Sequence, residues 1–197
     1  RSSDLCLILA PWNFPVNLSL APLVSAIAAG NTVILKPSEM TPNASALMAE
    51  LIAVVFDPTE VAVCEGDAQV AQALLALPFD HIFFTGSPAI GKVVMAAAAE
   101  HLTSVTLELG GKSPTIIDET ADLELAAANL AWSKFANAGQ TCIAPDHVYV
   151  HESVKDRFVQ AVIARLRRAF GDTPERQAQS PDFARVVNQR HLQRVNH

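Results

Sequence analysis

The chain has 197 residues, half of them hydrophobic, and its 14 basic and 20 acidic residues give a formal net charge of −6. This length supports one good core or two small ones. The negative charge gives no reason to expect a nucleic-acid partner, which requires a basic face. Three scattered cysteines do not form a disulfide framework and favour a reducing compartment, the cytoplasm. Pro, Gly and polar residues interrupt the apolar stretches, so we expect no membrane segment.

The first half of the chain alternates between short apolar runs and helical patterns. Gly30 and Pro58 mark the ends of the first two helices. Such alternation indicates right-handed βαβ crossovers and a parallel sheet covered on both faces. We predict strands at 5–10, 32–36, 61–64, 81–85 and 104–109, and helices at 16–29, 42–56, 67–77 and 88–102.

The segment GGKSP (110–114) breaks this rhythm and is the best candidate for a domain boundary. The predicted fold class is therefore α/β: a parallel-sheet, Rossmann-like domain at 1–110, an architecture that often binds dinucleotides, and a second α/β domain at 111–197. Beyond the boundary we predict a strand at 114–118, a helix at 122–136, a strand at 147–151, a helix at 154–170 and a polar loop at 171–182.

Ligands of parallel α/β sheets collect at the carboxyl ends of the strands, and four motifs of this chain fall there. One is the strand end Thr85-Gly86, followed by Ser87 and a proline. Ser is a good N-cap and Pro suits the first helical position, so the free N–H groups of this helix could attract a phosphate. An ordinary capped helix is the alternative. The spacing of Gly86 and Gly91 matches neither the usual dinucleotide fingerprint nor a P-loop.

Three further polar residues stand at strand ends. Glu39 in LKPSE could accept hydrogen bonds from a ribose diol, with Lys36 donating to the same sugar; alone, this motif favours a solvated strand end. Asn13 in PWNFP could donate N–H to a developing oxyanion, or could cap the helix that follows. The apolar strand around Glu108 would desolvate its carboxylate, which suits general-base work.

Cys142 lies in NAGQTCIAPD, among small residues and a proline. Cys6 and Cys64 differ because they lie in apolar runs, where a cysteine packs as a small hydrophobe. A cysteine attacks as its thiolate, so its surroundings must favour that form. A nearby oxidised nicotinamide would do so. A hydrolase would instead need a positioned imidazole, for which His147 and His151 are available.

Taken together, these motifs resemble the aldehyde dehydrogenase family. PWNFP, KPSE, FTGS…G, LELGGKSP and GQTC occur in the family's order, and the resemblance runs over essentially the whole chain. The separation of Glu108 from Cys142 is also shared with the family. GQTCIAPD and SPDFARVVNQRH further resemble the class 3 branch and its coniferyl-aldehyde dehydrogenase relatives.

The resemblance implies a role for each matching residue. Cys142 would be the nucleophile, Asn13 with the backbone N–H of Cys142 the oxyanion hole, and Glu108 the base that activates water. No metal is expected. The implied cofactor-binding residues are Lys36 and Glu39 at the adenosine ribose, Trp12 and Ser87 near the pyrophosphate, Thr85, Gly86 and Gly91 in the strand–helix turn, and Leu109 and Gly110 at the nicotinamide.

The implied reaction oxidises an aldehyde to a carboxylic acid with NAD(P), through a thiohemiacetal and a thioester on Cys142. We predict NAD rather than NADP because Glu39 would repel a 2′-phosphate, although class 3 relatives often accept both. The class 3 resemblance also implies aromatic or long aliphatic aldehydes as substrates, and homodimers of the full-length relatives.

Relatives in this family are more than twice as long as this chain. We therefore expect the cofactor half to be nearly complete, the catalytic half to be cut, and the chain as given to be poorly active. Two alternatives stay open: an inactive nucleotide-binding fragment, and a thiol esterase or hydrolase that uses no nucleotide.

Overall fold

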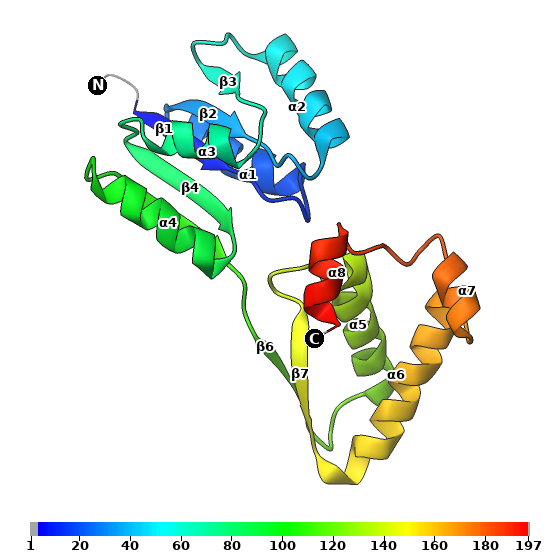
Figure 1. The fold of residues 1–197 in the computed structure, drawn as a ribbon. Helices are drawn as coiled ribbons and strands as arrows, with labels where there is room; N and C mark the ends of the chain where they lie inside the picture. The colour runs from blue at the N-terminus through cyan, green and yellow to red at the C-terminus, as the bar shows by residue number, and fades with distance from the viewer. Residues whose placement is uncertain (1–3, 197) are drawn as a thin grey trace. The chain divides into compact units, whose positions relative to one another are not determined.

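The computed structural model describes residues 4–196 (Figure 1). The chain divides at the Gly-Gly pair into two compact units, Arg1–Gly110 and Gly111–His197. The arrangement within each unit follows from its own strands and helices.

The first unit is built on a five-stranded parallel sheet with the strand order β3-β2-β1-β4-β5. This is a doubly wound order, in which the chain runs outward from β1 to β3 and then crosses back to β4 on the other side of β1. The predicted α/β class with a Rossmann-like parallel sheet is therefore confirmed. The strands are β1 (Leu5–Leu9), β2 (Thr32–Lys36), β3 (Val61–Val63), β4 (His81–Gly86) and β5 (Ser104–Leu109).

Helices cover both faces of this sheet. Successive residues of β1 point to opposite faces, so they pack against different helices. Cys6 and Ile8 pack with residues of α1 and α2, whereas Leu7 and Leu9 pack with residues of α3 and α4. Full burial of each such side chain contributes roughly 1.5–3 kcal/mol. The helices are α1 (Asn17–Ala28), α2 (Pro42–Val55), α3 (Ala68–Leu75) and α4 (Pro88–Ala99).

Gly30 ends α1 as the sequence predicts. Its φ is +85°, in the left-handed region that favours glycine. The N–H of Gly30 donates to Ile27 O at 2.8 Å and that of Asn31 to Ala26 O at 3.0 Å. These are the two bonds of a Schellman motif, and they satisfy carbonyls that the helix end leaves without partners.

The second unit has a two-stranded parallel sheet of β6 (Ser113–Ile117) and β7 (Pro145–Val150). Two long helices, α5 (Leu123–Phe135) and α6 (Lys155–Phe170), pack against it. Their shared core is made of Ile117, Leu123, Ala127, Val154 and Phe158. A left-handed turn, η1 (Ala136–Gly139), follows α5, and a short 3-10 turn, η2 (Glu152–Val154), follows β7.

The prediction of a polar loop at 171–182 is wrong, because α7 (Pro174–Gln179) lies within it. Thr173 caps this helix by accepting from Arg176 N, and Pro174 occupies its first turn. A further helix, α8 (Gln189–Val195), was not predicted. Both are short and exposed, so caps rather than an apolar periodicity define them. Nowhere in residues 4–196 does a helix combine the length and apolarity that a bilayer crossing needs.

Two buried serines of the first unit make a matched test of hydrogen bonding. Ser19 is 0% exposed and its Oγ has no partner among the described residues. Ser45 is 3% exposed, and its Oγ donates to Ser38 O at 2.9 Å or to Thr41 O at 3.1 Å. We expect Ser19→Ala to raise the free energy of unfolding by about 1 kcal/mol and Ser45→Ala to lower it by about 1 kcal/mol. Urea denaturation measures both free energies of unfolding. Equal effects of the two substitutions would contradict the assignment of Ser45 Oγ, but not Ser19 Oγ, as hydrogen-bonded among the described residues.

A pH dependence of stability follows from His81, the first residue of β4. Its ring nitrogens lie 2.8 Å from Ser104 Oγ and 3.1 Å from Thr106 Oγ1. Burial lowers the pKa of this imidazole. The unfolded chain therefore binds the proton more tightly, so stability is lost as the pH falls below the ordinary histidine value of about 6.5.

We expect His81→Gln to reduce the loss of stability between about pH 8 and pH 5. Urea denaturation at both pH values measures the loss in each variant. His101→Gln is the control, since His101 is exposed and its Nε2 bonds to a backbone carbonyl, Ala76 O. Wild type and His81→Gln with the same pH dependence would refute this prediction.

Candidate active site

The predicted cofactor residues of the first unit gather at one edge of its sheet. β1, β2, β4 and β5 are parallel, so their carboxyl ends lie together. Leu9 pairs with both Lys36 and Phe84, and Thr85 pairs with Glu108. Strand order reverses between β1 and β4, the place where doubly wound sheets bind ligands. Four adjacent strand ends carry Lys36 to Glu39, Trp12 and Asn13, Thr85 to Ser87, and Glu108 to Gly110.

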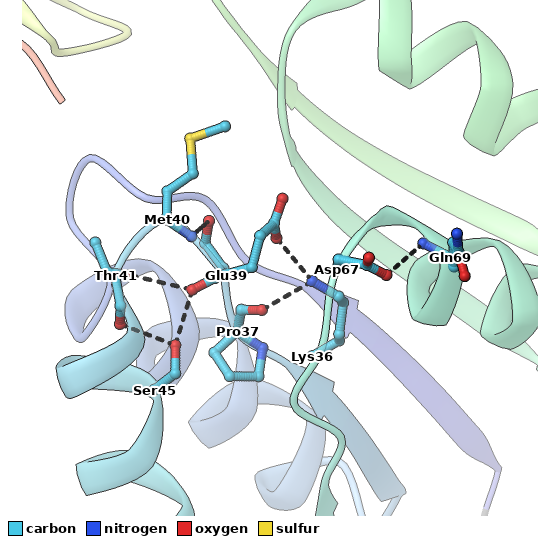
Figure 2. A network of polar contacts seen from close by, with 9 residues as sticks. Lys36, Pro37, Glu39, Met40, Thr41, Ser45, Asp67 and Gln69 are labelled. Carbon is cyan, nitrogen blue, oxygen red and sulfur yellow. Dashed lines mark hydrogen bonds and ion pairs between the residues drawn. The ribbon is translucent and has the colours of Figure 1, made fainter. Parts of the chain in front are cut away.

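Lys36 is buried at the end of β2, with a side chain that is 6% exposed. Its Nζ lies 3.1 Å from Glu39 Oε2 and donates to Pro37 O at 3.1 Å (Figure 2). The ammonium has three N–H donors, so within the described chain one remains for a ligand. Glu39 is 43% exposed and keeps its other oxygen, Oε1, outside this ion pair. The interpretation of Lys36 as a solvated surface lysine is therefore wrong.

A set of hydrogen bonds around Ser38 fixes the turn that carries Glu39. Ser45 Oγ and Thr41 Oγ1 both donate to Ser38 O, and Met40 N donates to Ser38 Oγ at 3.3 Å (Figure 2). These bonds join the end of β2 to the first turn of α2. The Lys36–Glu39 pair consequently has a rigid support, which is what recognition of a sugar requires.

The start of α4 supplies a second polar feature of the same edge. Ser87 is the N-cap, accepting from Ile90 N at 3.4 Å, and Pro88 opens the helix, both as the sequence predicts. Thr85, directly before it, is 7% exposed, and its Oγ1 is buried with no partner among the described residues. Burying a hydroxyl without a partner is costly. An anionic or hydroxylated ligand at this helix start would remove that cost.

Packing explains why Gly86 and Gly91, the two glycines of FTGS…G, have no side chain. A Cβ on Gly86 would lie 2.4 Å from Cζ of Phe84, so the ring excludes a larger residue. A Cβ on Gly91 would lie 3.1 Å from Cδ2 of Leu109, which shows that Gly91 lets α4 pack closely on β5. The Leu109 side chain is thus directed at α4. The space around Gly110 is open.

Glu108 does not have the desolvated setting that its apolar neighbours predict. It is exposed, because β5 is an edge strand of the five-stranded sheet and is covered less than the central strands. The apolar run identifies a strand but does not reveal its place in the sheet. Within the first unit the carboxylate is accessible to solvent.

Cys142 lies in the second unit, in the loop between η1 and β7. The residue is half-buried and its thiol is free. Gly111 approaches this loop: a Cβ there would lie 3.6 Å from the carbonyl oxygen of Cys142. Next to the cysteine, Thr141 Oγ1 is buried and has no partner in the described part of the chain. Ile143, on the other side, is 76% exposed.

No imidazole bonds to this thiol within the described residues of the second unit. His147 Nδ1 lies 3.5 Å from Asp146 Oδ2, and His151 Nε2 lies 3.5 Å from Glu119 Oε2. Each ring is thus directed to a carboxylate rather than to Cys142. This arrangement disfavours a Cys-His hydrolase, which needs its base within hydrogen-bond reach of the nucleophile.

The start of β7 is held by an ion pair across the small sheet. Lys112 Nζ lies 3.1 Å from Asp146 Oδ1, and this hydrogen bond lowers the pKa of the Asp146 carboxyl. The pair ties GGKSP to the residues that follow Cys142.

The other cysteines differ chemically from Cys142. Burial and the nearby carboxylates of Asp4 and Asp80 raise the pKa of the Cys6 thiol, which agrees with its interpretation as a small hydrophobe. Cys64 is also free. In the described part of the chain, no group of three or more His, Cys, Asp or Glu residues could hold a metal ion.

The first unit is thus a doubly wound α/β sheet with polar strand ends, and the second unit carries a half-buried cysteine in a loop. The family model described as "Aldehyde dehydrogenase family" matches residues 4–197, and the chain therefore belongs to the aldehyde dehydrogenase family. The sequence-based identification is confirmed.

Relatives and solved structures agree with this membership. Human aldehyde dehydrogenase family 3 member B1 is 48% identical over 191 residues, which are 97% of this chain and 40% of that protein. The rat "Aldehyde dehydrogenase, dimeric NADP-preferring" is 47% identical over 189 residues, 96% of this chain and 41% of that protein. A structure titled "Substrate bound state of Staphylococcus Aureus AldH" has a TM-score of 0.90 and 48% identity, over 98% of this chain and 42% of that one. The chain thus spans about two fifths of the length of these relatives.

Proposed function

We propose that the protein containing this chain oxidises an aldehyde to a carboxylic acid with a nicotinamide dinucleotide. The observation that carries the proposal is the gathering of four polar strand ends at the carboxyl edge of the doubly wound sheet, beside the reversal of strand order. Family membership supports the same reaction class.

The residues present fit such a dinucleotide. The buried Lys36 has an N–H available and Glu39 an oxygen, a donor and an acceptor suited to the two hydroxyls of a ribose. The hydroxyl of Thr85, which has no partner within residues 4–196, and the capped start of α4 suit a phosphate. We propose that Trp12, Gly86 and Ser87 lie at the pyrophosphate, and Leu109 and Gly110 at the nicotinamide. Gly91 would act indirectly, by setting α4 against β5.

We propose that the Cys142 thiolate attacks the carbonyl carbon of the aldehyde and forms a C–S bond. The resulting oxyanion accepts hydrogen bonds from the Asn13 carboxamide and the backbone N–H of Cys142. The oxyanion then re-forms a carbonyl as the C–H bond of the former aldehyde carbon breaks, which gives the thioester and releases a hydride. When bound, the dinucleotide would supply the acceptor for that hydride. Glu108 then takes a proton from water, the water oxygen attacks the thioester carbonyl, and Cys142 leaves as its thiolate.

Aldehyde-dependent formation of NADH tests these assignments. We expect Cys142→Ala to abolish it and Cys64→Ala, at another free cysteine, to leave it unchanged. Glu108→Gln should still acylate Cys142 but hydrolyse the thioester slowly, so intact-mass spectrometry would detect an acyl adduct. An aromatic and a long aliphatic aldehyde serve as substrates.

Other outcomes identify the alternatives. NAD binding without any acyl adduct would indicate a nucleotide-binding unit without catalysis. Ester hydrolysis that NAD does not affect, and that survives loss of Glu39, would indicate a thiol esterase instead.

We also propose that the chain prefers NAD to NADP, because the Glu39 carboxylate stands where a 2′-phosphate would add negative charge. The name of the rat relative points the other way, which makes the preference worth measuring. By titration we expect a lower Kd for NAD, and we expect Glu39→Gln to tighten NADP binding about tenfold, a change of about 1.4 kcal/mol. Glu60→Gln, at the amino end of β3, is the control. Tighter NADP binding by the wild type would overturn the proposal.

A further inference from the structure

The backbone that leads to Cys142 is in an unfavourable conformation. Asn137, Ala138 and Gly139 follow one another with φ of 51°, 53° and 75°, all in the left-handed region. A residue with a Cβ loses roughly 1–2 kcal/mol there, and Ala138 has no polar side chain to offset the loss. At Gly139 a Cβ would lie 3.0 Å from Lys134 O, so glycine is required. Such a turn persists only when its surroundings hold it.

Gln140 provides that hold with its side-chain amide. Nε2 donates to Asn137 O at 2.9 Å and to Arg185 O at 3.1 Å, while Oε1 accepts from Val187 N at 2.9 Å. One amide thus joins the left-handed turn to a segment that follows 45 residues later. The partners in these three bonds are backbone groups, which positions 137, 185 and 187 offer whatever their side chains. A carboxylate or an apolar residue of the same length could not make all three bonds.

Residues 183–187, the segment to which Gln140 is hydrogen-bonded, make further contacts that fix their position. The Phe183 ring packs on Phe170 with centroids 5.1 Å apart, and Phe170 packs on Phe135 at 6.2 Å. Phe135 is the last residue of α5, directly before the left-handed turn. Arg185 donates from its guanidinium to Phe183 O and to Ala178 O at the end of α7. The turn is therefore supported from both ends by one segment.

We propose that Gln140 is a positioning residue for Cys142. Through Arg185 and Val187 it holds the left-handed turn, and so sets where the thiol two residues further on is presented. This inference rests on the proposed role of Cys142 as the nucleophile. It adds that segment 183–187, which carries none of the residues assigned to the reaction, controls the reactivity of that thiol.

The test measures the alkylation rate of Cys142 by iodoacetamide, resolved by peptide mass spectrometry, with Cys64 as an internal reference. The same peptide in the urea-unfolded chain defines the rate of an unconstrained thiol. We expect Gln140→Met, which has similar length but no amide, to move the Cys142 rate at least about fivefold toward that reference. Gln140→Glu keeps only the acceptor for Val187 N. We expect its Cys142 alkylation rate to lie between those of the wild type and Gln140→Met. Gln177→Met is the matched control, since Gln177 makes one side-chain bond, to Gly171 O.

Each outcome has a defined meaning. A Cys142 rate equal to the reference in the wild type, or unchanged in Gln140→Met, would overturn the proposal, as would an equal effect of Gln177→Met. If Gln140→Met does not fold, judged by its urea transition, the Gln140→Glu rate decides. Alkylation needs neither aldehyde nor dinucleotide. An NADH assay in which Cys142→Ala retains activity would therefore refute the proposed function without bearing on the Gln140 contact.

Discussion

The parallel direction of all five strands is the constraint on which the chemistry of the first unit depends. Parallel strands need crossover connections, so every strand delivers its following loop to the same edge of the sheet. β1 lies at the centre, with Leu7 and Ile8 almost completely buried, and the strand order reverses beside it. A shift of one residue in the β1–β2 register would turn the alternating side chains to the opposite faces. The same core that stabilises the sheet therefore sets the position of Lys36.

Within the motifs at this edge, packing roles and ligand roles can be separated. Gly86 lies against the Phe84 ring and Gly91 against the Leu109 side chain, contacts that exist without any ligand. Thr85 is different, because its buried hydroxyl costs stability in the described chain and gains nothing from packing. Lys36 is different for a related reason, since a buried ammonium is tolerated only beside a carboxylate. Residues that the fold alone does not explain are the stronger candidates for binding.

The sequence predicts the first unit well because hydrophobic periodicity reports directly on alternating strands and helices. It predicts Ser87 and Gly30 as helix ends because caps depend on local chemistry. It fails at Glu108, since an apolar run does not distinguish an edge strand from a central one. It also fails at Gln140, whose partners lie on a distant segment, and at Ala138, whose left-handed backbone no residue preference indicates. Periodicity and helix caps can therefore be predicted from the sequence, whereas contacts between distant segments cannot.

The charge of the first unit limits how it can hold an anionic cofactor. Residues 1–110 contain three basic residues against ten acidic ones, and the ion pair with Glu39 already offsets the charge of Lys36. The first unit therefore has no excess of positive charge that would attract an anionic cofactor. Under the proposed function, recognition of the phosphates would come from oriented neutral donors, the N–H groups at the start of α4 and the hydroxyl of Thr85, which act at hydrogen-bond range. Such donors discriminate by position, so the close packing of α4 on β5 at Gly91 would contribute to the proposed recognition by setting where those donors lie.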